Sequence, residues 1–189
     1  MPEGEKLLST TGILMAILNP EREGRLLLRQ REEQSSLIPG KSFLGNWELP
    51  GGGARVPVGQ VPYDYLLQEG LRELEEEVGI HLEVRGMPAM YSTLYAPARD
   101  HALVVPQVAI ASPTKGKTRW ASVEEMNQLA RDYVPADIAK AQGLSEARGL
   151  VSGWGRRMHC ACLAAMRHSP NQEFVLEARR TLDEIVRAW

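Results

Sequence analysis

The spacing of apolar residues predicts a helix near the middle of the chain. From about Pro62 to Val78 these residues recur at steps of four, three and four, which is the spacing of one face of an α-helix. They are Leu67, Leu71, Leu74 and Val78. Gly79 follows at a position where a glycine commonly ends a helix. The sequence therefore predicts one amphipathic helix with a polar opposite face.

That polar face carries a dense group of acids, with five glutamates inside nine residues. They are Glu69, Glu73, Glu75, Glu76 and Glu77. Helical spacing puts Glu73, Glu76 and Glu77 on one face, which Glu69 extends by one turn, whereas Glu75 points elsewhere. Like charges at this spacing destabilise a helix by roughly a few tenths of a kcal/mol per pair, and the helix dipole disfavours anions near the C-terminus. A hard divalent cation would offset both effects, because magnesium prefers oxygen ligands.

Strand signals lie on both sides of this helix. Extended segments are predicted at 11–18, 25–31, 47–49, 81–95 and 102–111. The first two form a hairpin, and the third stops at the glycine-rich turn 50–53. Loops are predicted at 32–46 and 54–61, and a turn at 97–100. Strands combined with one helix indicate a layered α/β domain.

The C-terminal part of the chain has a helical pattern. Ser122 to Glu125 is a capping box, so a helix starts there. We expect the last helix to start at Ser169–Gln172, with a cap and a proline at its first position. Its apolar stripe consists of Phe174, Ala178, Leu182, Ile185 and Trp189. We therefore divide the 189 residues into a domain at 1–134 and a helical extension at 135–189, packed on the domain or on a second subunit.

Composition limits the partners of the chain. Its formal net charge of -2 gives no global attraction to nucleic acid or to an anionic membrane. No apolar run is long enough to span a membrane, and Glu3 and Glu5 precede the first apolar run, which is unlike a signal peptide. The two cysteines, Cys160 and Cys162, form no disulfide framework, so we expect a cytoplasmic protein.

A zinc site at His159, Cys160, Cys162 and His168 is a second interpretation of those cysteines. On one helix these side chains point around the axis, which does not suit a tetrahedral ion. Cys162 instead continues a core stripe with Met158, Leu163 and Met166. We favour buried cysteine.

The segment from Arg72 to Ile80 resembles the second half of the Nudix box, G-x5-E-x7-R-E-U-x-E-E-x-G-U, where U is a bulky aliphatic residue, and matches it without exception. The segment Gly45–Gly52 is similar to the family's G-x-W-x-x-P-G-G pattern. Residues 26–31 and 119–125 resemble its second strand and the start of its last helix, so the likeness covers about 11–132. It implies a Nudix-type α/β/α sandwich with a mixed sheet.

The same resemblance implies a metal site and a chemistry. Glu73, Glu76 and Glu77 would bind Mg²⁺ or Mn²⁺, and the carbonyl of Gly52 would complete the coordination. The metal would neutralise a diphosphate and activate water. Arg72 would pair with one carboxylate and fix its rotamer. Gly70 stands where the family has a small residue, consistent with close helix packing.

The first half of the box departs from the family pattern. Twenty residues separate Gly52 from Arg72, six more than the pattern allows. Either Gln60 or Asp64 takes the place of the first box glutamate, and we prefer Asp64 because it keeps an acid at the correct helical distance. This change bears on substrate preference more than on hydrolysis.

Several further residues are candidates for the site. The general base is Glu76 or Glu73, or else Asp100 in the 96–101 turn, and Glu69 is an additional ligand or base. Arg31 is either a phosphate contact or an exposed strand arginine. Other residues that could bear on substrate recognition are Trp47, Tyr91, Tyr95 and Pro97.

The predicted activity is hydrolysis of the diphosphate linkage in a nucleoside diphosphate joined to another moiety. A nucleotide sugar or ADP-ribose is the first choice of substrate, and a nucleoside triphosphate the second. The alternative is a non-catalytic nucleotide sensor on the same fold; such proteins lose box carboxylates, and this chain keeps three. A homodimer through the helical extension is a further hypothesis.

Overall fold

The computed structural model describes residues 8–19, 22, 25–32, 44–57, 63–82, 89–94, 99–105, 113–132, 162–163, 165–169 and 171–187. Within these residues, seven strands form one sheet with a central order of β3-β2-β1-β6-β5. The strands are β1 (Leu8–Asn19), β2 (Arg25–Gln30), β3 (Trp47–Glu48), β4 (Gly51–Pro57), β5 (Ala89–Leu94), β6 (Arg99–Val105) and β7 (Thr118–Ala121). β4 pairs with β1, and β7 with β2. The β1–β6 pair is parallel and the others are antiparallel, so the sheet is mixed.

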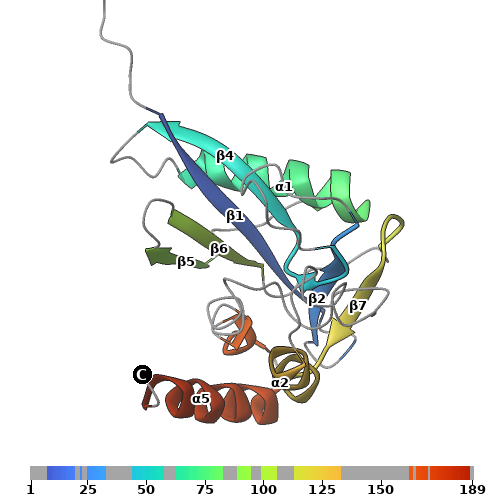
Figure 1. Ribbon diagram of the computed structural model, residues 1–189, viewed down its shortest axis with the longest axis vertical. Helices are drawn as coiled ribbons and strands as arrows, with labels where there is room; N and C mark the ends of the chain where they lie inside the picture. Colours follow the sequence, from blue (N-terminus) through green and yellow to red (C-terminus); the bar gives the residue numbers. More distant parts are fainter. Residues whose placement is uncertain are drawn as a thin grey trace, which may run out of the picture.

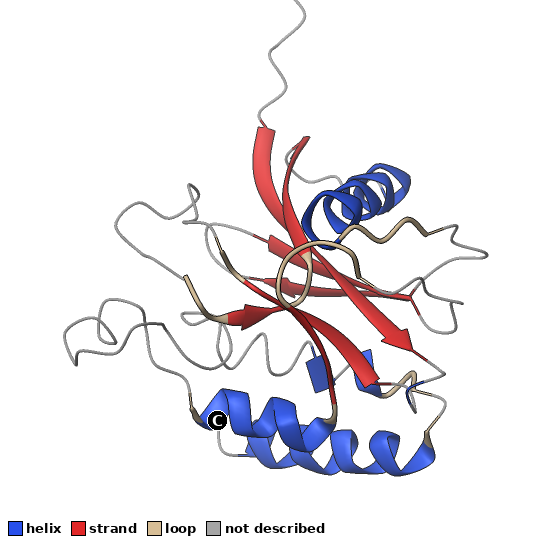
Figure 2. Cartoon of the chain, turned by 90° about the vertical axis from the view of Figure 1, so that its right-hand side faces the viewer, coloured by secondary structure: helices blue, strands red, loops and turns tan. Residues whose placement is uncertain are grey.

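In the described part of the chain, three helices cover the two faces of this sheet. They are α1 (Tyr63–Val78), α2 (Val123–Arg131) and α5 (Gln172–Arg187). Figures 1 and 2 show α1 on one side of the sheet and α2 and α5 on the other. The predicted α/β sandwich with a mixed sheet is confirmed.

The central strand β1 is buried on both faces, which follows from its continuous apolar sequence. Ile13, Met15 and Ile17 pack into the core beneath α1, and Ala16 and Leu18 pack into the core beneath α2 and α5. Successive strand residues point to opposite faces. One apolar run therefore supplies both cores.

The strand β4 corrects the first part of our prediction of a loop at 54–61, since 54–57 are in the strand and 58–61 lie outside the described residues. Gly51 to Pro57 pair residue by residue with β1, and Ala54 and Val56 are buried while Arg55 is exposed. A Cβ on Gly51 would lie 1.9 Å from the carbonyl oxygen of Ile13. The glycines therefore allow close approach of two strands, a role that sequence alone does not distinguish from a turn.

Two boundaries also differ from the prediction. β6 begins at Arg99, so Asp100 lies in a strand and not in a turn. The last helix begins at Gln172, and its cap is Asn171, whose Oδ1 accepts hydrogen bonds from the backbone N–H groups of Glu173 and Phe174. Ser169 instead accepts a bond from the N–H of Asn171, so the predicted cap was two residues early.

Two further predictions agree with the structure, whereas the extended segment at 81–95 was predicted to start too early, because residues 81 and 82 are not in a strand. β1 and β2 form the hairpin, and Ser122 and Glu125 make both bonds of the capping box. The predicted extended segment 81–95 contains β5, while residues 106–111 lie outside the described part of the chain.

In the C-terminal part, Ala178 of α5 is buried in the same core as α2, and Phe174 and Leu182 pack against that core. Cys162, Leu163 and Met166 are also buried there, as the core interpretation predicted. Met158, His159 and Cys160 lie outside the described residues. No helix in the described parts is both long and apolar enough to cross a membrane.

Candidate active site

Helix α1 carries the predicted site, and a glycine lets it lie close to the sheet. The buried residues of the helix are Leu66, Gly70, Leu74 and Val78, a row of four-residue steps. Leu67 and Leu71 of the predicted stripe are only partly buried. A Cβ on Gly70 would lie 2.4 Å from Sδ of Met15, so a larger residue would require the Met15 side chain to move. Burial of each large apolar side chain contributes about 1.5–3 kcal/mol, which outweighs the repulsion between neighbouring glutamates.

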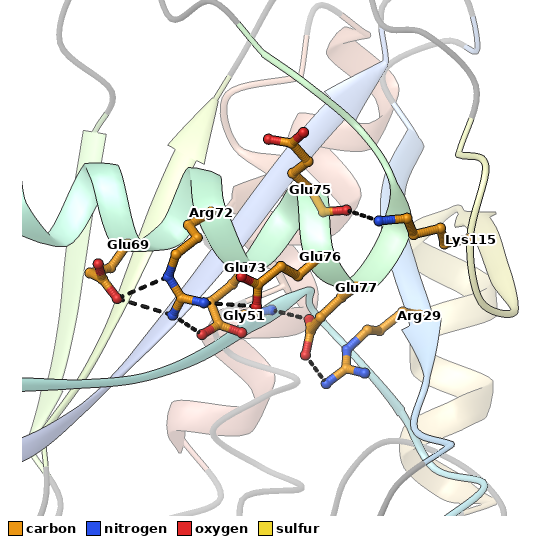
Figure 3. Close-up of polar contacts among 9 residues, drawn as sticks. All are labelled: Arg29, Gly51, Glu69, Arg72, Glu73, Glu75, Glu76, Glu77 and Lys115. Atoms are coloured by element: carbon orange, nitrogen blue, oxygen red, sulfur yellow. Dashed lines mark hydrogen bonds and ion pairs between the residues drawn. The ribbon is translucent and has the colours of Figure 1, made fainter.

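Glu77 is largely buried, like Glu73, with 17% of its side chain exposed, and it points at the glycine-rich end of β4 (Figure 3). Its Oε2 accepts a hydrogen bond of 2.8 Å from the N–H of Gly51, and its Oε1 pairs with Arg29. Burial raises the pKa of Glu77 to about 7, although Arg29 and the Gly51 N–H both act in the opposite direction. A carboxylate in this position gains from a further cation.

Glu73, Glu76 and Glu69 surround the guanidinium of Arg72. The Arg72 Nη1 lies 2.7 Å from Glu76, and Nη2 lies 3.0 Å from Glu69 and also contacts Glu73. These hydrogen bonds raise the pKa of Arg72. The predicted pairing of Arg72 with one carboxylate is thus a pairing with three, drawn in Figure 3.

The backbone of β4 closes the other side of this acidic group. A Cβ on Gly52 would lie 2.5 Å from Oε2 of Glu73, so the missing side chain gives the carboxylate direct access to the main chain. Glu75, by contrast, lies away from the group and faces His81 at 3.5 Å. Glu73, Glu76, Glu77 and Gly52 therefore occur together, as the helical spacing and the resemblance predicted.

Sequence reasoning missed two members of the site, Arg29 and Glu48. Neighbouring strands β2 and β3 place them opposite each other, and Arg29 Nη2 lies 2.6 Å from Glu48 Oε1. Arg31, which we did predict, is bonded to the same oxygen at 2.9 Å. Its side chain is 19% exposed, so it is a largely buried ion pair and not a free strand arginine. The sequence did contain one indication that Arg29 belongs to the site, because residues 29 and 31 share one face of the predicted strand.

A distant loop caps the acidic end of α1. The backbone N–H groups of Thr114 and Lys115 donate to the carbonyl of Val78, and Lys115 Nζ donates to the carbonyl of Glu75 at 3.1 Å. Gly79 ends the helix with a φ of 69°. A cation at a helix C-terminus is favourable, and the last turn of α1 has no basic residue of its own.

The remaining candidates lie elsewhere. Asp100 is in β6, opposite Gly12 and Thr93. Asp64 is exposed in the first turn of α1. Trp47 is partly buried, and the guanidinium of Arg119 lies 4.3 Å from its ring centre. Tyr91 is in β5; Gln60, Tyr95 and Pro97 fall outside the described residues.

The donor set suits a hard divalent cation. Its ligating atoms are carboxylate and carbonyl oxygens, and five carboxylates face three guanidinium groups, which leaves a formal charge of -2. Within the described residues, no three acidic, histidine or cysteine side chains are arranged as a ready-made metal site. Arg72 and Arg29 hold the carboxylates instead, so a cation would have to replace these contacts.

Comparison with solved structures finds Nudix proteins. A MutT Nudix hydrolase from Burkholderia pseudomallei is 25% identical, with 61% of this chain and 84% of that chain covered and a TM-score of 0.39. An ADP-ribose pyrophosphatase from Streptococcus suis is 16% identical, with 84% and 92% covered and a TM-score of 0.43. The Nudix domain of Shewanella oneidensis NrtR, complexed with ADP ribose, is 19% identical, with 62% and 75% covered and a TM-score of 0.40.

No family model matches the chain, and neither does any curated protein. Because the TM-scores of these structures lie below 0.5, the case for a function rests on the residues of the site itself.

Proposed function

We propose that this chain is a Nudix-type hydrolase that cleaves the diphosphate linkage of a nucleoside diphosphate joined to another moiety. The observation that carries the proposal is the excess of carboxylates from one helical face against the backbone of Gly51 and Gly52. A solvated acidic face would not need a buried glutamate or a strand without side chains opposite it.

In this proposal, Glu73, Glu76, Glu77 and the carbonyl of Gly52 hold Mg²⁺ or Mn²⁺. The bound metal supplies charge neutralisation at the diphosphate and an activated water. Arg72 orients Glu73 and Glu76 through its ion pairs.

Other residues of the site have supporting roles. Arg31, which is paired with Glu48, contacts a substrate phosphate in this proposal. Glu76, whose side chain is 60% exposed, or Glu73 takes the proton of the attacking water. Glu69 adds negative charge one turn away.

The first substrates to test are nucleotide sugars and ADP-ribose, followed by nucleoside triphosphates. The experiment is a substrate panel with magnesium on wild type, Glu76→Gln and Glu75→Gln. Glu75→Gln is a matched control, because it makes the same change in charge on the same helix away from the site. We expect activity in wild type and the control, and a loss of at least about a hundredfold in Glu76→Gln.

The alternative function is a nucleotide sensor. If wild type binds a nucleotide and hydrolyses none of the panel, the sensor replaces the hydrolase. If Glu76→Gln is as active as wild type, the proposed metal site is wrong.

We also propose that the protein is cytoplasmic and forms a homodimer through residues 135–189. Support for the dimer comes from the apolar stripe of the last helix, although Ala178 of that stripe already packs on the chain's own core. Truncation at Pro135 followed by measurement of the molar mass in solution is the test, and an unchanged stoichiometry argues against it.

A further inference from the structure

We infer that Glu48 is a positioning residue for the metal site, because it provides the alternative partner for Arg29 when Glu77 binds a divalent cation. This inference rests on the proposed function. It assigns a role to a buried carboxylate that lies outside the Nudix box.

Arg29 is shared between two carboxylates on different elements. It lies on β2, 2.6 Å from Glu48 of β3, and it also pairs with Glu77 of α1. All three side chains are at most 17% exposed, so these charges are poorly solvated. A change at one carboxylate must therefore affect the pairing at the other.

Both oxygens of Glu77 already have a partner. Oε1 pairs with Arg29, and Oε2 accepts the N–H of Gly51. The Gly51 N–H belongs to a strand so tightly packed that no Cβ fits at that position. The Arg29 side chain has rotatable bonds and is the partner that can leave when a cation binds Glu77.

Glu48 allows Arg29 to leave Glu77, because it remains as a partner for the guanidinium. An unpaired guanidinium in a buried place is costly, and Glu48, whose side chain is 6% exposed, is already in contact with Arg29. Nε of Arg29 is buried without a hydrogen-bond partner among the described residues. It is a spare donor, and a small rotation toward Glu48 would give a bidentate arginine–carboxylate pair.

Arg31 holds the other side of this arrangement. Its Nε donates to Glu48 Oε1 at 2.9 Å, which fixes the orientation of the carboxylate. Two arginines and two glutamates thus form a neutral buried group, and binding of a cation to Glu77 would shift Arg29 within that group without exposing it.

The test is a double-mutant cycle on Mn²⁺ affinity, measured on the full chain by electron paramagnetic resonance of free Mn²⁺. The variants are Glu48→Gln, Arg29→Gln, the double variant, and Glu75→Gln as a matched charge control. We expect Glu48→Gln to weaken Mn²⁺ binding by about tenfold or more. Arg29→Gln should bind Mn²⁺ at least as tightly as wild type, because it removes the competitor for Glu77.

The coupling between the two substitutions distinguishes an exchange of partners by Arg29 from independent effects of each charge on Mn²⁺ affinity. Once Arg29 is gone, Glu48→Gln should change the affinity by less than about twofold, whereas independent charge effects would add. Additive effects, or weaker Mn²⁺ binding by Arg29→Gln, overturn the inference. So does an effect of Glu75→Gln as large as that of Glu48→Gln.

Folding and the proposed function are checked separately. Urea unfolding followed by tryptophan fluorescence shows whether each variant is folded. If Glu48→Gln does not fold, Arg29→Gln and the double variant still test the inference, because both should bind Mn²⁺ at least as tightly as wild type. Wild type that binds no Mn²⁺ refutes the proposed metal site itself. Wild type that binds Mn²⁺ without coupling between Glu48 and Arg29 refutes only the positioning role.

Discussion

Loss of the proton from Glu77 should make the metal-free protein less stable as the pH rises from 5 to 8. Burial raises the pKa of this carboxyl in the folded chain to about 7, against an ordinary value of 4.5. The folded chain therefore holds the proton more tightly than the unfolded chain does. The resulting stability is fully present below about pH 4.5 and is lost as the pH rises through about 7.

The size of this effect follows from the difference between the two pKa values. At about 1.4 kcal/mol for each tenfold change in proton affinity, the loss is about 3 kcal/mol. Because the side chain is only 17% exposed, solvent screening removes little of it. Glu77→Gln keeps the shape of the side chain and cannot ionise, so this pH dependence should vanish in the variant.

The assay is urea unfolding with EDTA present, followed by tryptophan fluorescence, at several pH values between 5 and 8. The measured quantity is the free energy of unfolding of wild type minus that of Glu77→Gln, which cancels the titration of all other groups. We expect this difference to fall by about 3 kcal/mol across the range. Parallel profiles for the two proteins would refute an elevated pKa of Glu77.

Two further substitutions test how the site is built. Gly51→Ala should lower the free energy of unfolding, measured in urea, by about 2–5 kcal/mol. The reason is that the new Cβ would lie 1.9 Å from the backbone oxygen of Ile13. A variant as stable as wild type would mean that β1 and β4 are less closely packed. Lys115→Gln should cost about 0.3–1 kcal/mol at low salt and less at high salt, because it removes the ammonium from the carbonyl of Glu75; a loss that does not depend on salt would argue against a charge effect.

The fold could be predicted from the sequence where one periodicity dominates. The hairpin of β1 and β2, helix α1 and the capping box at Ser122 all follow from local patterns. The strand β4 could not, because three consecutive glycines indicate a turn unless the partner strand is known. The buried face of α1 was also misplaced toward Leu67 and Leu71, since Gly70 has no hydrophobic signal although it is buried against Met15.

Apart from Gly52 and Arg31, the site could be predicted only as far as it lies on one helix. Spacing alone puts Glu73, Glu76 and Glu77 together, because i, i+3 and i+4 are neighbours in any α-helix. Arg29 and Glu48 join the site through strand pairing between β2 and β3. The two residues are far apart in the sequence, so their pairing can be recognised only from the register of the sheet.

The arrangement of charges explains how the fold tolerates the acidic end of α1 and which kind of ligand binds there favourably. One half of the site, made of Arg29, Arg31, Glu48 and Glu77, is formally neutral, whereas the other half, in which Glu76 is 60% exposed, has only Arg72 to balance three carboxylates. Unbalanced charge at the surface is screened and costs little, but the same charge buried would cost several kcal/mol, roughly. The site therefore attracts a cation from its exposed side, and without that cation it repels an anionic diphosphate. Under the proposed function, the metal must accompany or precede the substrate, and the neutral half then only has to shift Arg29 from Glu77 toward Glu48.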